Sequence, residues 1–235
     1  MSQYNKLYTP QDSAVVFIDH QPQMLFGVGG IDRAAYINNV VLLAKAAKEF
    51  KVPTVLTAVE TEGFSGYVYP QLLDVFPGQE VVERSSMNSW DSEGFRNAIK
   101  ATGRKNILMT GLWTEVCICW PTIEMLAEGY NIYVVEDCCG ATSPAAQEAA
   151  LSRMAQAGAI RLTTIAAVLE WQRDWALKEH YNALMTLIKQ QGGAYGVGVE
   201  YAYTMVHHAP QSAQKPQVVA KKEKTAGVGL PPQPK

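Results

Sequence analysis

The sequence predicts a single doubly wound, three-layer α/β/α domain with a central, mostly parallel sheet of about six strands. Short apolar runs alternate with amphipathic stretches from residue 13 to residue 176, and this alternation is typical of repeated strand–helix units. The runs are continuously apolar, as expected of parallel strands that are covered on both faces. With 235 residues, 48% of them hydrophobic, the chain is long enough to bury one such core.

The elements are expected to follow one another in strand–helix order. The first strand, at residues 14–18, ends at Asp19, and the helix at residues 32–50 has apolar residues at helical spacing. Pro144 suits the first turn of a helix at residues 144–157, because no hydrogen bond is lost there. Further strands are expected at residues 54–59, 80–84, 107–109, 131–136 and 160–163, and further helices at residues 69–76, 91–101, 165–175, 178–190 and from residue 115 onward.

The composition divides the chain into three parts. Residues 1–190 are expected to form the α/β domain, and residues 191–208 form a Gly- and Tyr-rich extension that could contact a neighbouring subunit. Residues 209–235 are rich in Pro, Gln and Lys, and we expect a disordered tail there.

Charge and hydropathy exclude several classes of partner. Twenty basic and 22 acidic residues give a net charge of −2, which favours neither nucleic acid nor an anionic membrane surface. No apolar stretch has the length of a membrane span, and the first eleven residues lack the apolar core of a signal peptide. We expect a cytoplasmic protein in which the four cysteines are reduced.

Cys117 is the candidate nucleophile. It follows the apolar run at residues 107–109, and Thr114 is suited to cap a helix that begins near Glu115. A thiol in the first helical turn lies near the positive end of the helix dipole, which favours the thiolate. Such a position can lower the thiol pKa by one or more units from its ordinary value of about 8.5.

Two further polar residues follow strands that should end at the same edge of the sheet. Asp19 and Arg84 each come after an apolar run, as does the Cys117 segment, and active sites of open parallel sheets lie at the carboxyl ends of the strands. Asp19 could accept the thiol proton, and Arg84 would place a positive charge beside both groups. Backbone N–H groups from Thr114 to Cys117 could hold an oxyanion.

Three segments carry a resemblance to the isochorismatase-like cysteine hydrolases over residues 10–175. They are VVFIDHQ at residues 15–21, RSSMNSW at residues 84–90 and GLWTEVC at residues 111–117, the last followed by GYNIYVVED at residues 129–137. The resemblance implies a catalytic triad formed by Asp19, Arg84 and Cys117, although the family usually has Lys at the second position. It also implies a cis peptide before the Thr of the nucleophile loop, here Trp113–Thr114.

The resemblance further implies an activity. Family members that retain this cysteine are amidases, so the expected reaction is cleavage of a small amide or related C–N bond through a Cys117 thioester, without cofactor or metal. Residues 60–67 contain no His, which argues against the metal site of a nicotinamidase. Arg84 and residues 88–90 are similar to the YcaC-like branch, whose members form octamers, so a homo-oligomer is expected. A guanidinium does not release its proton, and Asp19 would transfer protons alone.

Other interpretations remain open at this point. Phe26, Asn88, Trp90 and Trp113 could line an apolar substrate pocket. The fold could instead serve as a weakly active or inactive scaffold, with Arg84 marking lost turnover. Cys138 and Cys139 follow a strand that ends near Asp137, where they could form a redox pair at the rim of the sheet. A zinc site built from the four cysteines is disfavoured because their spacing matches no common finger.

Overall fold

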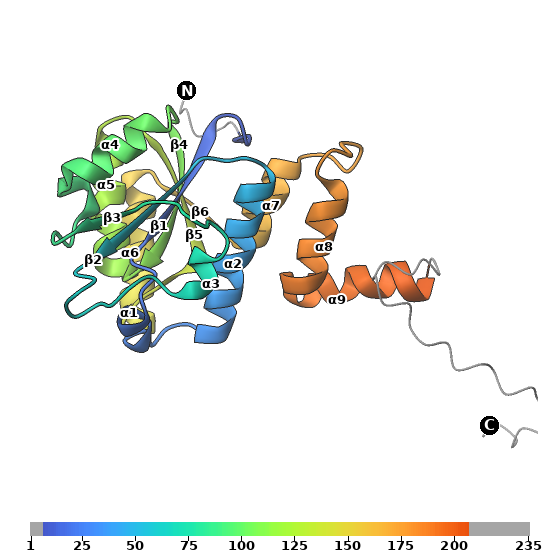
Figure 1. The fold of residues 1–235 in the computed structure, drawn as a ribbon, viewed down its shortest axis with the longest axis horizontal. Helices are drawn as coiled ribbons and strands as arrows, with labels where there is room; N and C mark the ends of the chain where they lie inside the picture. Colours follow the sequence, from blue (N-terminus) through green and yellow to red (C-terminus); the bar gives the residue numbers. More distant parts are fainter. Residues whose placement is uncertain (1–6, 207–235) are drawn as a thin grey trace, which may run out of the picture.

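A single sheet of six parallel strands forms the centre of the molecule. The structure, a computed structural model, describes residues 7–206. The strand order is β3-β2-β1-β4-β5-β6, so the chain builds outward from β1 in both directions (Figure 1). This confirms the predicted doubly wound α/β fold. The strands are β1 (Ser13–Ile18), β2 (Thr54–Val59), β3 (Val81–Arg84), β4 (Asn106–Leu112), β5 (Asn131–Gly140) and β6 (Ile160–Leu162).

Helices cover both faces of the sheet. Two of them begin as the sequence indicates: Asp32 caps α2 by accepting from Ala35 N–H, and Ser143 caps α6 by accepting from Ala146 N–H. Helices α2 and α7 lie on one face and α4, α5 and α6 on the other. The helices are α1 (Pro22–Phe26), α2 (Arg33–Glu49), α3 (Pro70–Leu73), α4 (Glu93–Ala101), α5 (Cys119–Ala127), α6 (Pro144–Ala157), α7 (Thr164–Gln172), α8 (Tyr181–Gln191) and α9 (Gly193–Tyr201), with the short helical turns η2 (Ser89–Asp91), η3 (Thr114–Ile118) and η4 (Ala202–Val206).

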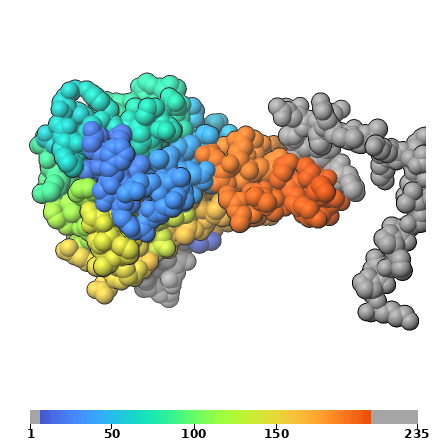
Figure 2. Space-filling view, turned by 90° about the horizontal axis from the view of Figure 1, so that it is seen from below, coloured from blue at the N-terminus to red at the C-terminus, as the bar shows by residue number. Residues whose placement is uncertain are grey.

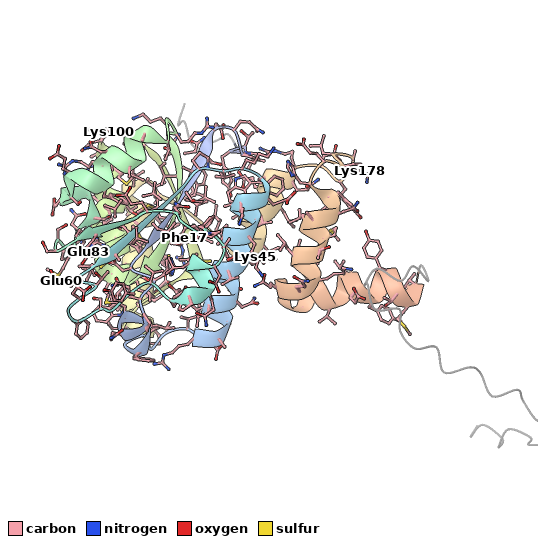
Figure 3. The ribbon with its side chains drawn as sticks, viewed as in Figure 1. Phe17, Lys45, Glu60, Glu83, Lys100 and Lys178 are labelled. Atoms are coloured by element: carbon pink, nitrogen blue, oxygen red, sulfur yellow. The ribbon has the colours of Figure 1, made fainter. Side chains whose placement is uncertain are left out.

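The core includes one polar network. Phe17, in the middle of β1, is buried (Figure 3). Its ring contacts those of His20 and Phe76. The fully enclosed His20 ring faces Thr110 Oγ1 at 3.0 Å through Nε2, and its Nδ1 faces the hydroxyls of Tyr36 at 2.6 Å and Tyr69 at 3.1 Å. Burial lowers the pKa of His20 to about 3, so the ring is neutral.

Strands β4 and β5 extend further than the sequence predicts. β4 continues to Leu112 and pairs Ile18 with Gly111, whose φ is +148°. A Cβ at Gly111 would lie 2.1 Å from Ile18 O, so only glycine fits here. β5 continues to Gly140, and Cys138 and Cys139 therefore lie buried within this strand. The expectation that they occupy the rim is wrong.

The last helices extend away from the sheet (Figure 1). α8 packs on α2 through Leu184, Met185 and Ile188, and α9 packs on α8. The division into residues 1–190 and 191–208 stays a prediction, and the expected tail at residues 209–235 lies outside the described residues. Within residues 7–206, no helix is both long and apolar enough to cross a membrane.

Candidate functional site

Asp19 occupies the centre of the carboxyl edge of the sheet. It directly follows β1, and its backbone has a φ of 54°, which is unusual for a residue other than glycine. Its N–H donates to Thr57 O at 3.0 Å, so the neighbouring strand β2 holds the turn. The side chain is fully buried. Strained backbone of this kind concentrates at functional sites because the surrounding structure has to enforce it.

Arg84 reaches Asp19 from the end of β3, across the intervening strand β2. Its Nη2 lies 2.7 Å from Oδ1 and 2.6 Å from Oδ2 of Asp19. Its Nη1 donates to Ser86 O and, at 3.5 Å, to Met87 O. Both side chains are almost completely inaccessible to solvent, so the carboxylate has its counter-charge inside the protein. The sequence-based pairing of these two residues is therefore present in the fold.

Cys117 lies against the same carboxyl group. Burial raises the pKa of Asp19, whereas Arg84 and hydrogen bonds from Cys117 and Arg84 lower it. Burial, the Asp19 charge and the hydrogen bond to Asp19 raise the pKa of the Cys117 thiol to about 12, against the opposing effect of Arg84. The expected lowering of the thiol pKa by the helix dipole is thus wrong, because desolvation and the adjacent carboxylate outweigh it. The Cys117 thiol is thus protonated, and it lies beside the Asp19 carboxyl group.

The turn that carries Cys117 differs from the predicted helix start. Residues Thr114–Ile118 form one π-helical turn before α5, and Thr114 is its first residue instead of its cap. The Thr114 hydroxyl donates to Gln147 Oε1 on α6 at 2.7 Å. The cis peptide joins Leu112 and Trp113. It lies one bond before the expected Trp113–Thr114 position, which is a correction to the prediction.

The four expected pocket residues do not share one environment. Trp113 Nε1 donates to Met24 O at 2.8 Å, which holds its ring against helix α1. Phe26 is in the same helix and is 72% exposed. Trp90, in contrast, is buried, and its Nε1 donates to Glu128 at 2.7 Å.

Trp90 packs between α4 and α5. Its ring contacts those of Phe95 and Tyr130, which argues against Trp90 as a pocket residue. Asn88 is also turned toward α5, where its Nδ2 donates to Glu124 at 2.9 Å. Together, Asn88 and Trp90 anchor the segment after Arg84, whereas the pocket roles of Phe26 and Trp113 stay predictions.

Sequence reasoning missed two supporting side chains. The Gln21 amide accepts from Val59 N–H at 3.1 Å and donates to Val59 O at 2.9 Å, so it continues the hydrogen-bond ladder at the end of β2. Gln147 accepts a hydrogen bond from the Thr114 hydroxyl and thereby fixes the turn that carries Cys117. Gln21 follows Asp19 by two residues, which is a local signal. Gln147 lies on a distant helix, and nothing in its sequence context indicates this contact.

The remaining cysteines have local partners. Cys138 Sγ lies 3.0 Å from Thr164 Oγ1, and Cys139 Sγ donates to Met109 O at 3.8 Å. Both thiols are fully buried, and each has its own hydrogen-bond partner. Among residues 7–206, no three His, Cys, Asp or Glu side chains are grouped as metal ligands would be.

Comparison with known proteins identifies the family. The isochorismatase domain model matches residues 13–166. The curated relative named "Probable hydrolase YcaC" of Escherichia coli (strain K12) is 37% identical over 165 residues, covering 70% of this chain and 79% of the relative.

Two solved structures have the same fold. YcaC from Pseudomonas aeruginosa, solved with hexane-2,5-diol and covalent acrylamide, superposes with a TM-score of 0.79 at 33% identity and covers 85% of this chain and 98% of that chain. YcaC of Escherichia coli, described as an octameric hydrolase of unknown specificity, superposes with a TM-score of 0.81 at 33% identity, covering 88% of this chain and 100% of that chain. The chain therefore belongs to the isochorismatase family, as a hydrolase of its YcaC-like branch.

Proposed function

We propose that this hydrolase cleaves a small amide or related C–N bond through a thioester at Cys117, without a cofactor or metal. The observation that carries the proposal is the position of the Asp19 carboxyl group, which hydrogen-bonds the Cys117 thiol and is held through both its oxygens by Arg84. A nucleophile, a base and a fixed counter-charge are the parts that covalent acyl transfer requires.

In the first half of the reaction, Asp19 accepts the thiol proton as the Cys117 sulfur attacks the substrate carbonyl carbon. The tetrahedral adduct collapses when the C–N bond breaks, and Asp19 returns the proton to the leaving nitrogen. In the second half, Asp19 takes a proton from water, whose oxygen attacks the thioester carbonyl. The C–S bond then breaks, and the proton passes back to sulfur.

Arg84 keeps its proton throughout this cycle, because a guanidinium does not deprotonate in the accessible pH range. Its role in the proposal is to orient Asp19 and to stabilise its charge. The oxyanion would be held by backbone N–H groups of the turn at Thr114 and Cys117. Val116 N–H and Ile118 N–H are already directed to Trp113 O, at 3.1 and 3.4 Å.

Two properties of the relatives support the proposal. The Pseudomonas aeruginosa protein was solved with covalent acrylamide, a small amide whose double bond reacts with thiols. The Escherichia coli protein is an octamer, and we propose that this chain also forms a homo-oligomer. In this chain Cys117 is only 3% exposed, which favours a substrate small enough to reach a nearly enclosed sulfur.

The test is ammonia release from a panel of small primary amides. Activity is expected for the wild type and is expected to be lost in Cys117→Ala and Asp19→Asn, whereas Cys119→Ala, which removes a buried thiol two residues away, serves as the matched control. Activity should fall as the pH drops through the raised pKa of Asp19, because protonation removes the base. A Cys117→Ala variant that keeps its activity, or a panel that yields no ammonia, would refute the proposal; the latter result would favour the scaffold interpretation.

A further inference from the structure

Helix α9 is joined to the rest of the molecule by close backbone contact with α8. A Cβ at Gly192 would lie 2.5 Å from Ile188 O, and one at Gly196 would lie 2.2 Å from the same atom. Glycine at these positions therefore allows the tight corner between the two helices. Val199 is buried on this side of α9. The side of α9 that faces α8 is thus occupied by its packing on α8.

The opposite side of α9 and the following turn η4 carry large apolar residues that no described element covers. Val197, Tyr201 and Met205 are spaced by four residues and are 71%, 59% and 62% exposed. Residues at this spacing lie along one side of a helix, and Val199 lies about half a turn away from Val197. We name the surface formed by Val197, Tyr201 and Met205 the arm face. Exposed apolar side chains that are grouped in this way are typical of an interaction site.

Charge restricts the kind of partner. Within residues 193–206 the only side chain of Asp, Glu, Lys, Arg or His type is Glu200, and Lys189 pairs with it at 3.2 Å. The arm face therefore offers no uncompensated charge to an acidic or basic partner such as nucleic acid. An apolar and neutral surface is complementary to another surface of the same composition, as in an isologous contact between identical subunits.

The arm, defined as α8, α9 and η4 (residues 181–206), is also pre-organised for binding. It extends from the rounded body of the molecule, as Figure 2 shows. Its corner is tied back to α2, because Asn38 Nδ2 donates to Gln191 O at 2.8 Å, and the Tyr181 and Tyr203 hydroxyls are hydrogen-bonded within it. Binding to a surface whose backbone is already ordered costs less conformational entropy.

We propose that the arm face docks against the arm of a second copy of this chain and is a principal contact of the assembly. This inference rests on the proposed homo-oligomer. The superposition on the octameric Escherichia coli relative covers 88% of this chain and all of that chain, so it extends past α7 into the arm. The relative that assembles thus has a counterpart to at least part of this element.

The experiment measures the mass of the full chain in solution by sedimentation velocity. Wild type should be multimeric, whereas Val197→Glu and Val197→Lys should each shift the protein to smaller species, with at least a tenfold weaker association. Gln156→Glu, on the exposed surface of α6, adds the same charge elsewhere and should leave the mass unchanged. A one-to-one mixture of the Glu and Lys variants should restore the larger species, because the two apposed arm faces then carry opposite charges.

The outcomes separate the two proposals. A wild-type chain that sediments as a single copy overturns the homo-oligomer, and this inference with it. A wild-type multimer whose mass is unchanged in both Val197 variants overturns the arm contact alone. In that second case, residues 207–235 are deleted and the binding of an apolar dye is compared with that of the full chain. Increased dye binding would show that the chain's own end, and not a second copy, covers the arm face. A mixture that fails to recover the larger species overturns the direct arm-to-arm contact.

Discussion

Replacing His20 is expected to change how stability depends on pH. In the folded protein His20 is fully buried, and its pKa is lowered from 6.5 to about 3. The Thr110 hydroxyl donates to Val16 O at 2.9 Å, so it accepts from His20 Nε2–H. Nδ1 is left as the acceptor that faces the hydroxyls of Tyr36 and Tyr69, which also hydrogen-bond each other. In the folded state the His20 ring is therefore neutral, whereas in the unfolded chain it takes up a proton below about pH 6.5.

The magnitude follows from the two pKa values. A depressed pKa contributes stability that is present above the unfolded value of 6.5 and is lost as the pH falls toward 3. Each unit corresponds to about 1.4 kcal/mol, so the full interval amounts to about 5 kcal/mol. Between pH 5.5 and 4.5 the folded ring stays neutral and the unfolded one is charged, which makes the slope about 1.4 kcal/mol per pH unit.

Urea unfolding at fixed protein concentration measures this slope. His20→Gln keeps one acceptor and one donor in the network but cannot take up a proton, so its unfolding free energy should fall less steeply with pH than that of wild type, by about 1.4 kcal/mol per unit. His180→Gln, whose imidazole pairs with Glu49 near the surface, controls for the loss of one histidine as such. Equal slopes for wild type and His20→Gln would refute the assignment of a buried neutral ring.

Two further predictions concern the edge of the sheet. Arg84→Met leaves the buried Asp19 without its partner and should lower the unfolding free energy by about 3–5 kcal/mol. Adding Asp19→Asn should recover most of this loss in urea titrations at pH 7. A double variant as unstable as the sum of both single variants would contradict a direct pair. Gly111→Ala should lower the unfolding free energy by about 2 kcal/mol or more, because its Cβ would meet Ile18 O. Gly129→Ala is the control: it has a φ of +81° and no atom within 4 Å of the added Cβ, and it should cost about 1–2 kcal/mol. Equal losses in the two variants would show that the clash at Gly111 is relieved.

Residues that begin or end helices and strands made several elements predictable. β2 runs over Thr54–Val59 and α6 over Pro144–Ala157, as expected, because Pro53 precedes the strand and Ser143 caps the helix. The end of β5 was predicted wrongly for a non-local reason. Asp137 resembles a strand terminus, yet its carboxylate accepts from Thr164 N–H and Oγ1 at the start of α7, both at 2.8 Å. The strand continues past Asp137 to Gly140.

The candidate site was predictable in composition but not in electrostatics. Strand ends placed Asp19 and Arg84 at one edge, and the structure joins them directly. The pKa of Cys117 could not be inferred from sequence, because it depends on burial and on the distance to a carboxylate far away in the chain. The same limit applies to Trp90, whose aromatic ring suits a pocket or a core equally until α4 and α5 are placed around it.

The position of β1 in the sheet has a consequence for folding during synthesis. β1 is the first strand to be synthesised, but its partner β4 is made much later, and parallel pairings between distant segments form slowly. Asp19 therefore has no contact with Cys117 until β4 has paired with β1. A nascent chain arrested before β4 would therefore contain Asp19 without Cys117 beside it.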